Sequence, residues 1–221
     1  DGWLNDIQGR HLTPQHVFAA LERASSDPVQ EGNCGAGTGT LCYRFKGGIG
    51  TASRVLPASL GGYTLGVLVQ TNFGSREQLI LRGQAIGRQL KDWPPVPSEP
   101  LPAPQAGSVM LVLATDAPLS SRQLTRLARR APLGLARTGF TSGSGSGDYV
   151  IAFSTQTFEY PVKRASTQPL ERLLTEDPIL SALFQAAVEA VEESVYNALL
   201  AAETMAGRDG HTAFAIPREI R

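Results

Sequence analysis

The spacing of hydrophobic and polar residues predicts one helix and then a series of strands in the first half of the chain. Thr13 and Pro14 suit the cap and the first position of a helix, and apolar residues follow at helical spacing as far as Ala24. After a glycine-rich stretch, β-branched and aromatic residues separated by glycines predict strands over 40–46, 49–56, 62–72 and 77–82.

The second half of the chain is expected to contain two strands and two helices. A nearly continuous apolar run starts at Ser108 and is typical of a strand covered on both faces. A basic amphipathic helix is expected over 119–130. A Gly/Ser stretch over 141–147 then leads into a second apolar strand over 148–155. The last element, a helix over 178–206, carries apolar residues at a spacing that would cover a sheet.

A proline-rich segment separates the two halves. Residues 92–107 contain Pro94, Pro95, Pro97, Pro100, Pro102 and Pro104, which favour an extended linker over a helix or a central strand. The order of elements is helix, strands, linker, strand, helix, strand, helix. Sheets flanked by helices satisfy that order, so we expect a layered α/β or α+β domain.

Composition and charge narrow the possible partners. The 221 residues carry 20 basic and 20 acidic side chains, and 42% of the residues are hydrophobic. Without a basic stripe, we expect no nucleic acid partner. The apolar runs are shorter than the roughly 18 residues that indicate a membrane span, so we expect a soluble protein and no membrane partner. The localisation, cytoplasmic or periplasmic, stays open, because a chain that starts without Met is expected to lack upstream residues.

Cysteine and histidine usage gives no reason to expect a metal or another cofactor. Cys34 and Cys42 lack the C-x-x-C spacing of zinc or redox centres; free thiols are favoured, and a disulfide stays open. His11 and His16 are five residues apart, which does not suit a zinc site on one helix face. A Ser-His-Asp triad is not excluded by residue order, but structural or solvated roles are favoured for these two and for His211.

The glycine-rich stretch over 32–39 does not fit a nucleotide-binding motif. A P-loop requires Lys followed by Ser or Thr after its last glycine, and a dinucleotide fingerprint requires a following helix where this sequence predicts a strand. A loop whose glycines allow close backbone approach or positive φ is the better interpretation.

The junction between linker and strand offers a different route to catalysis. If the bond before Ser108 were cut, the α-amino group of Ser108 could accept the proton of its own hydroxyl, because α-amines titrate near neutral pH. Gly107 has no Cβ, so its carbonyl can be approached, and the linker could move away once cut. On spacing alone this is a weak signal, since Gly-Ser pairs are common in loops.

Nine sequence blocks, taken in order, resemble the L-aminopeptidase D-amidase/D-esterase family, which includes the β-peptidyl aminopeptidases. They run from end to end of the chain: Asp1-Gly-Trp-Leu-Asn-Asp-Ile7, Glu31-Gly-Asn-Cys-Gly-Ala-Gly-Thr-Gly39, Phe45-Lys-Gly-Gly-Ile-Gly-Thr-Ala-Ser-Arg54, Leu68-Val-Gln-Thr-Asn-Phe-Gly74, Gly107-Ser108, Ala114-Thr-Asp-Ala-Pro118, Leu127-Ala-Arg-Arg130, Gly145-Ser-Gly-Asp148 and Ala202-Glu-Thr-Met-Ala-Gly-Arg208.

The resemblance implies a fold and a division of the chain. The fold class is α+β, a four-layer αββα sandwich that here lacks its amino-terminal portion. Self-cleavage at Gly107-Ser108 would leave 1–107 as the end of a larger subunit and 108–221 as a smaller subunit, the two together forming one structural domain. The missing amino-terminal segment of the same precursor and further copies of the protein, in a tetramer of processed units, are the expected partners.

The resemblance also implies roles for four residues. Ser108 is the nucleophile, and the amide of Asn72 helps to form the oxyanion hole. Ser146 and Asp148 orient the nucleophile and its amine; some family members carry Glu in place of Asp148. From the residues alone, Ser146 and Asp148 also fit a strand-entry turn with a capping carboxylate.

The expected function is therefore that of a self-cleaving aminopeptidase. It would release amino-terminal residues, L-α- or β-amino acids, from small peptides, amides or esters through an acyl-enzyme on Ser108. Two alternatives stay open. One is an acyltransferase or pantetheine-type amide hydrolase on the same fold, and the other is an inert binding module.

Overall fold

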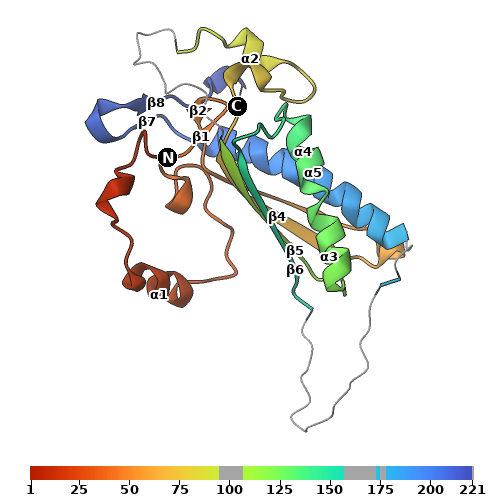
Figure 1. Ribbon diagram of the computed structural model, residues 1–221. Coiled ribbons are helices and arrows are strands. Elements are labelled where there is room, and N and C mark those ends of the chain that lie inside the picture. The colour runs from red at the N-terminus through yellow and green to blue at the C-terminus, as the bar shows by residue number, and fades with distance from the viewer. Residues whose placement is uncertain (95–106, 157–172, 175–177, 221) are drawn as a thin grey trace.

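The computed structural model describes residues 1–94, 107–156, 173–174 and 178–220 (Figure 1). Most of the predicted proline-rich linker lies outside these residues. Within the described part of the chain, helices and strands combine as the predicted α+β class requires. No helix there combines the length and the apolar character that crossing a membrane would need.

A four-stranded sheet forms the centre of the molecule. Its strands are β3 (Ile49–Val55), β4 (Thr64–Asn72), β5 (Ser108–Thr115) and β6 (Gly147–Ser154), side by side in that order. β3 pairs with β4 and β4 with β5 in antiparallel register, whereas β5 and β6 run parallel. The predicted strand after the linker is confirmed and starts at Ser108.

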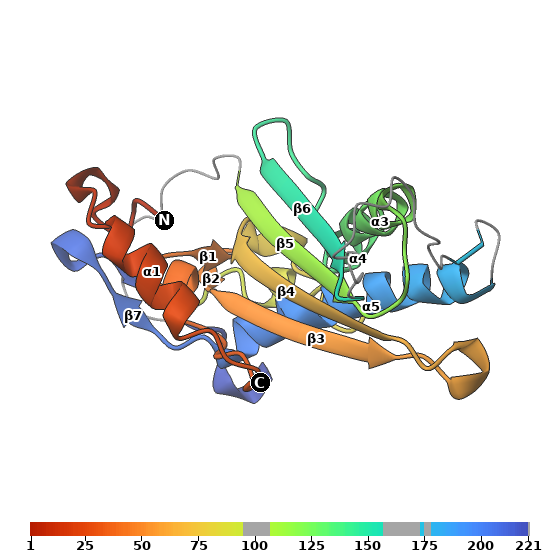
Figure 2. The same ribbon diagram turned by 90° about the horizontal axis from the view of Figure 1, so that it is seen from below.

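Three helices cover one face of this sheet (Figures 1 and 2). The long helix α5 (Pro178–Ala201) packs across β3 and β4, α3 (Ser121–Ala128) contacts β6, and α4 (Ala131–Arg137) packs against α5. Alternate residues of β4 and β5 point into this layer and are buried: Leu65, Val67, Val69, Val109, Leu111 and Leu113. This period of two places the hydrophobic core between the sheet and the helices.

The opposite face of the sheet, which we call the open face, is not covered by the described residues. Met110, Tyr149, Ile151 and Phe153 are 39%, 63%, 56% and 44% exposed. Among the described residues, the strand from Ser108 is covered on one face only, so the predicted cover on both faces is not seen there. Its apolar side chains do point both ways, but only one side meets a packing layer. The described residues form two adjacent layers, one of helices and one of strands, of the four expected.

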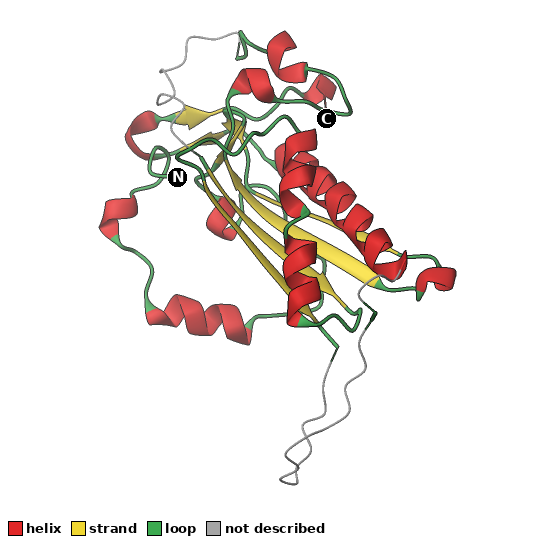
Figure 3. Cartoon of the chain, turned by 45° about the vertical axis from the view of Figure 1, so that its right-hand side comes forward, coloured by secondary structure: helices red, strands yellow, loops and turns green. Residues whose placement is uncertain are grey.

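Most of the smaller elements surround the end of the sheet where β5 begins, whereas the 3-10 turn Ala58–Leu60 joins β3 to β4 at the opposite end (Figure 3). The smaller elements are α1 (Pro14–Glu22), α2 (Ile86–Gln89), β1 (Leu41–Cys42), β2 (Phe45–Lys46), β7 (Met205–Ala206), β8 (Thr212–Ala213), and 3-10 turns at Ile7–Gly9, Gly35–Gly37, Ala58–Leu60, Arg76–Gln78, Arg208–Gly210 and Arg218–Ile220. The rings of Trp3 and His211 stack with centroids 4.9 Å apart, which ties the start of the chain to the β7–β8 hairpin.

The structure corrects two of the predicted strands. The strand expected over 77–82 is wrong: Ser75 starts a 3-10 turn with a capping box, and Arg82 has a positive φ of 50° that interrupts extended backbone. The strand expected over 40–46 is split into β1 and β2, because Tyr43 and Arg44 adopt positive φ and reverse the chain.

Two predicted helices also differ from the observed ones. The helix expected over 119–130 ends at Ala128, and a separate helix, α4, starts at Ala131 with Pro132 in its first turn, where proline suits a new helix but not a continuing one. The helix expected over 178–206 ends at Ala201.

Candidate active site

Ser108 and Asn72 face each other from the two central strands, at the end of the sheet where β5 begins. Asn72 is the last residue of β4, Ser108 is the first of β5, and the antiparallel register pairs them directly. Directly opposed side chains share one face and have Cβ atoms about 4.5–5.5 Å apart. Strand alternation places both on the open face with Met110, and both residues are partly exposed. The register therefore brings the predicted nucleophile and the predicted oxyanion donor together.

Gly107 is held tightly against the end of β4. A Cβ at this position would collide with the backbone of Phe73 and would lie 2.6 Å from the carbonyl oxygen of Asn72. The Gly107 carbonyl oxygen accepts a hydrogen bond of 3.2 Å from the backbone N–H of Gly147. The carbonyl that would be attacked in self-cleavage is thus fixed and polarised by a backbone donor, and only glycine fits beside it.

A backbone hydrogen bond orients the amide of Asn72. The N–H of Leu41 donates to Asn72 Oδ1 over 3.2 Å. Because an N–H can only donate, this contact identifies the oxygen and leaves Nδ2 as the donor end of the amide. Among the described residues Nδ2 has no hydrogen-bond partner. The free donor is what an oxyanion site requires.

Ser146 and Asp148 form a hydrogen-bonded pair at the start of β6. Ser146 Oγ donates to Asp148 Oδ1 over 2.6 Å, and the residue between them, Gly147, is the ladder partner of Ser108. No hydrogen bond links Ser108 to this pair in the described part of the chain. The pair therefore flanks the ladder partner of Ser108, but Asp148 is the ladder partner of Val109, so strand alternation turns its side chain toward the helix-covered face and away from the face that carries the Ser108 side chain.

Gly147 was not singled out from the sequence, yet it shapes the surroundings of Ser108. A Cβ at Gly147 would lie 3.1 Å from Ser108 Oγ, tighter than ordinary packing allows. The missing side chain therefore leaves room for the hydroxyl. The sequence carried a signal for this, a glycine enclosed by the two polar residues of the Gly-Ser-Gly-Asp block.

Lys46 is a second residue that the sequence did not identify. Its side chain is fully buried, and its Nζ donates to the carbonyl oxygens of Gly37, Thr40 and Gly47 over 3.0, 2.9 and 2.6 Å. Burial lowers the pKa of Lys46 to about 8, so the group is mainly cationic at neutral pH.

The cysteines and histidines lie outside the group of candidate site residues, which are Ser108, Asn72, Ser146 and Asp148. Cys34 and Cys42 are both free thiols, as the favoured interpretation expected, and burial raises the pKa of Cys42. His16 Nδ1 accepts the backbone N–H of Thr13 at the start of α1, and His11 is an exposed residue near Asp6. His211 Nδ1 lies 2.7 Å from the carbonyl oxygen of Trp3. The structural or solvated roles favoured for all three are confirmed.

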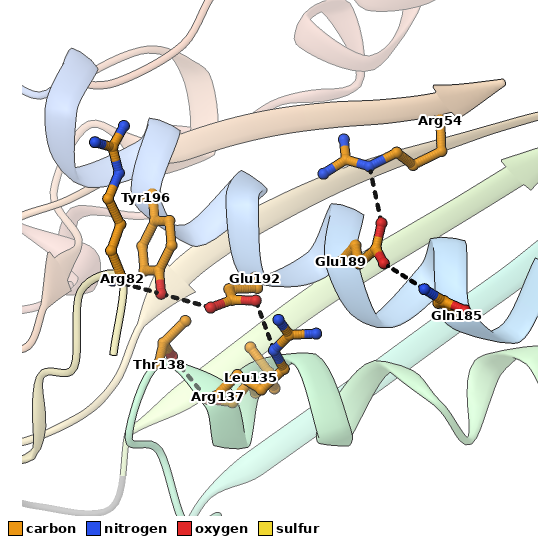
Figure 4. Close-up of polar contacts among 9 residues, drawn as sticks. All are labelled: Arg54, Arg82, Leu135, Arg137, Thr138, Gln185, Glu189, Glu192 and Tyr196. Atoms are coloured by element: carbon orange, nitrogen blue, oxygen red, sulfur yellow. Dashed lines mark hydrogen bonds and ion pairs between the residues drawn. The ribbon is translucent and has the colours of Figure 1, made fainter. Parts of the chain in front are cut away.

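A cavity of about 670 Å³ lies on the outer side of α5, away from Ser108 and Asn72, which do not line it. Figure 4 shows five of its charged side chains: Arg54, Arg82, Arg137, Glu189 and Glu192. Glu192 accepts from the hydroxyl of Tyr196 over 2.7 Å and pairs with Arg137 over 2.7 Å, while Glu189 pairs with Arg54. These pairs join α5 to α4 and β3, so the charges have a structural explanation.

Comparison with known proteins agrees with this arrangement of residues. The sequence pattern of Peptidase family S58 matches residues 1–213. The chain belongs to this family. A β-peptidyl aminopeptidase of Sphingosinicella xenopeptidilytica is 45% identical over 226 residues, which cover 99% of this chain and 56% of that protein.

Solved structures of two aminopeptidases show the same fold. A β-aminopeptidase from Burkholderia sp. matches with a TM-score of 0.86 and 44% identity, covering 99% of this chain and 60% of that one. An L-aminopeptidase D-Ala-esterase/amidase from Ochrobactrum anthropi, described as a variant of the Ntn hydrolase fold, matches with a TM-score of 0.83 and 42% identity, covering 97% and 57%. The chain thus spans somewhat more than half of the length of these relatives. The resemblance predicted from the nine blocks is confirmed.

Proposed function

We propose that this S58 chain is the catalytic portion of a self-cleaving aminopeptidase whose nucleophile is Ser108. The observation that carries the proposal is the pairing of Asn72 with Ser108 across β4 and β5, with the Gly107 carbonyl held at the same point. Similarity to β-peptidyl aminopeptidases and to an L-aminopeptidase supports hydrolysis over acyl transfer to an amine.

Self-cleavage would proceed by an N-to-O acyl shift. Ser108 Oγ attacks the Gly107 carbonyl carbon, the C–N bond breaks, and the nitrogen takes a proton to become the α-amine of Ser108. Water then hydrolyses the ester and leaves a carboxylate on Gly107. The N–H of Gly147, 3.2 Å from the carbonyl oxygen, is placed to stabilise the negative charge that develops there.

Substrate hydrolysis would use the same hydroxyl with its new base. The freed α-amine accepts the hydroxyl proton while Ser108 Oγ attacks the substrate carbonyl, and the amine or alcohol leaves with that proton. Water, giving a proton to the α-amine, then attacks the ester on Ser108 Oγ, which releases the acid and restores the hydroxyl. Asn72 Nδ2, which the Leu41 contact leaves free, would donate to the oxyanion. Removal of one such donor typically raises the activation free energy by roughly 3–4 kcal/mol. Ser146 and Asp148 are proposed to orient the amine.

The open face suggests how the active site is completed. Ser108 and Asn72 lie on it beside exposed apolar side chains such as Tyr149 and Ile151. We propose that the further amino-terminal segment of the precursor covers this face with a second sheet. Substrate would then bind between the two layers, with residues 1–107 and 108–221 as parts of two subunits of one domain, assembled into a tetramer.

The test is self-cleavage of the full-length protein, followed by denaturing electrophoresis and amino-terminal sequencing. Wild type is expected to yield a fragment that starts Ser-Val-Met-Leu and to release amino-terminal residues from β- or L-aminoacyl amides. Ser108→Ala is expected to stay intact and inactive, and Ser144→Ala, in the exposed Gly/Ser loop, serves as the matched control. A folded wild-type protein that never splits would refute the proposal.

A further inference from the structure

Lys46 is a buried cation for which the structure provides no carboxylate partner. No ion pair of Lys46 occurs among the described residues, and its three N–H donors are all directed at backbone carbonyls. Isolated charges in protein interiors are costly, and a neutral apolar residue could fill the same space at lower cost. The position of the charge therefore calls for an explanation beyond packing.

One of the three carbonyls belongs to the peptide group that orients Asn72. Lys46 Nζ donates to the carbonyl oxygen of Thr40 over 2.9 Å, and the N–H on the other side of that peptide plane, from Leu41, donates to Asn72 Oδ1 over 3.2 Å. Cation, peptide group and amide thus form a continuous chain of hydrogen bonds. The far end of that chain is the free Asn72 Nδ2.

The surrounding backbone holds this series of hydrogen bonds in a fixed position. β1 lies beside the end of β4, where the N–H of Phe73 donates to the carbonyl of Leu41 and the N–H of Tyr43 donates to the carbonyl of Phe73, over 3.1 and 2.7 Å. Thr71 Oγ1 bonds both the N–H and the carbonyl of Gly48, each over 3.0 Å. The peptide between Thr40 and Leu41 has little freedom to turn away from Asn72.

We propose that Lys46 is a positioning residue for the oxyanion hole, acting through the Thr40–Leu41 peptide on the amide of Asn72. A cation at the carbonyl end polarises the peptide, so its N–H donates more strongly to Asn72 Oδ1. That hydrogen bond withdraws electron density from the amide, and Nδ2–H becomes a better donor to the developing oxyanion. Hydrogen bonds in a chain strengthen one another in this way, most of all away from water. The inference rests on the proposed function and assigns Lys46 no direct contact with substrate.

The experiment is a double-mutant cycle in the full-length, self-cleaved protein. Wild type, Lys46→Met, Asn72→Ala and the double variant are compared by kcat and KM on an aminoacyl p-nitroanilide. The concentration of active sites is measured with a serine-directed acylating reagent, so that unfolded or uncut molecules are not counted. Lys91→Met makes the same change at a lysine whose side chain is 70% exposed.

If Lys46 acts through Asn72, the variants should differ in kcat and KM in a characteristic way. Lys46→Met is expected to lower kcat at least about ten-fold while KM stays within about three-fold of wild type, because a strengthened oxyanion contact acts mainly in the transition state. In the Asn72→Ala background the same change is expected to have little further effect, because the group that it acts upon is gone. Lys91→Met is expected to match wild type.

Two outcomes would overturn the inference. One is an unchanged kcat in Lys46→Met, and the other is an equal fold-loss with and without Asn72, which would show a merely structural effect. If Lys46→Met does not fold, Lys46→Gln is compared in the same cycle, since it fills the site with a shorter neutral donor. A wild type without a cleaved fragment or turnover would refute the proposed function itself, and an active wild type with an insensitive Lys46 would refute only this inference.

Discussion

Hydrogen-bond donors and empty space, more than charged side chains, define the surroundings of Ser108. The Gly107 carbonyl accepts a backbone N–H, the amide of Asn72 is oriented by another, and two glycines, Gly107 and Gly147, leave room where a methyl group would collide or crowd its neighbour. Backbone donors cost no reorganisation during a reaction, because the strands hold them in place. We therefore expect substitutions near Ser108 to change reaction rates by shifting atoms by a few tenths of an ångström.

Gly147→Ala tests this steric argument. The added methyl group would lie 3.1 Å from Ser108 Oγ, so the hydroxyl must turn away from its present direction, and both self-cleavage and turnover are expected to slow at least about ten-fold. Rates of fragment appearance in the full-length protein measure the effect. Gly143→Ala, in the same loop with nothing within 4 Å of its added Cβ, is the control and should behave as wild type. Equal rates for the two variants would contradict the argument.

The residue scale also marks a limit of sequence reasoning. Ser108 became a candidate because a proline-rich linker meets an apolar strand there and because Gly107-Ser108 is one of the blocks that resemble the family, and Asn72 became one through its block alone. Lys46 lay inside another such block, but a lysine in a polar glycine-rich stretch is ordinarily expected in solvent. Its role depends on carbonyls contributed by positions 37, 40 and 47, and a linear pattern does not show that they converge.

At the scale of elements, apolar periodicity correctly predicted the strands and helices that present a long, regular apolar face to the core. β5 and α5 were predicted with nearly the observed starts, because each carries a long, regular run. The prediction over 77–82 failed where local turn chemistry at Ser75 and Arg82 outweighed the β propensity of the following residues. α4 was missed because its seven residues include a glycine and a proline, which weaken any helical signal.

The glycine in α4 has a packing reason that a substitution can test. A Cβ at Gly134 would lie 2.6 Å from the carbonyl oxygen of Val188 and 2.7 Å from Val191 Cβ, so α4 approaches α5 closely only without a side chain there. Gly134→Ala is expected to lower the free energy of unfolding by about 1–3 kcal/mol from overpacking, although alanine is the better helix former by about 1 kcal/mol. Urea denaturation of the full-length protein measures the difference.

Gly143→Ala again provides the comparison, because it makes the same chemical change in open space. It is expected to alter the free energy of unfolding by less than about 0.5 kcal/mol. A Gly134→Ala protein at least as stable as wild type would show that the helices can separate without cost.

At the scale of the whole molecule, the distribution of apolar side chains is one-sided. The helix-covered face of the sheet holds a continuous core, whereas Met110, Tyr149, Ile151 and Phe153 are exposed on the other. Contiguous exposed apolar residues in strands usually mark a packing surface. This asymmetry agrees with a chain that spans 56–60% of the relatives that it matches.

A charged residue placed on the open face tests whether this face is buried in the full-length protein. Ile151→Glu is expected to destabilise that protein by more than about 3 kcal/mol, because it would bury an unpaired carboxylate beneath the proposed second sheet. Leu133→Glu, on the solvent side of α4, is the matched control, since Leu133 is 55% exposed here and Ile151 is 56% exposed; it should cost less than about 1 kcal/mol. Thermal unfolding of both in a Ser108→Ala background gives the comparison. Similar small losses would mean that the open face stays in solvent.

The position of the Gly107–Ser108 bond has a consequence for what a cut there would leave behind. β3 and β4 precede the bond, β5 and β6 follow it, and eight register pairs join β4 to β5, while α5 from the later part lies across β3 and β4 from the earlier part. The two products would be interlocked halves of one sheet, unable to part without losing the shared core. Once separated by denaturant, they would have to find each other in solution, so recovery would depend on concentration, whereas the uncut chain could refold alone.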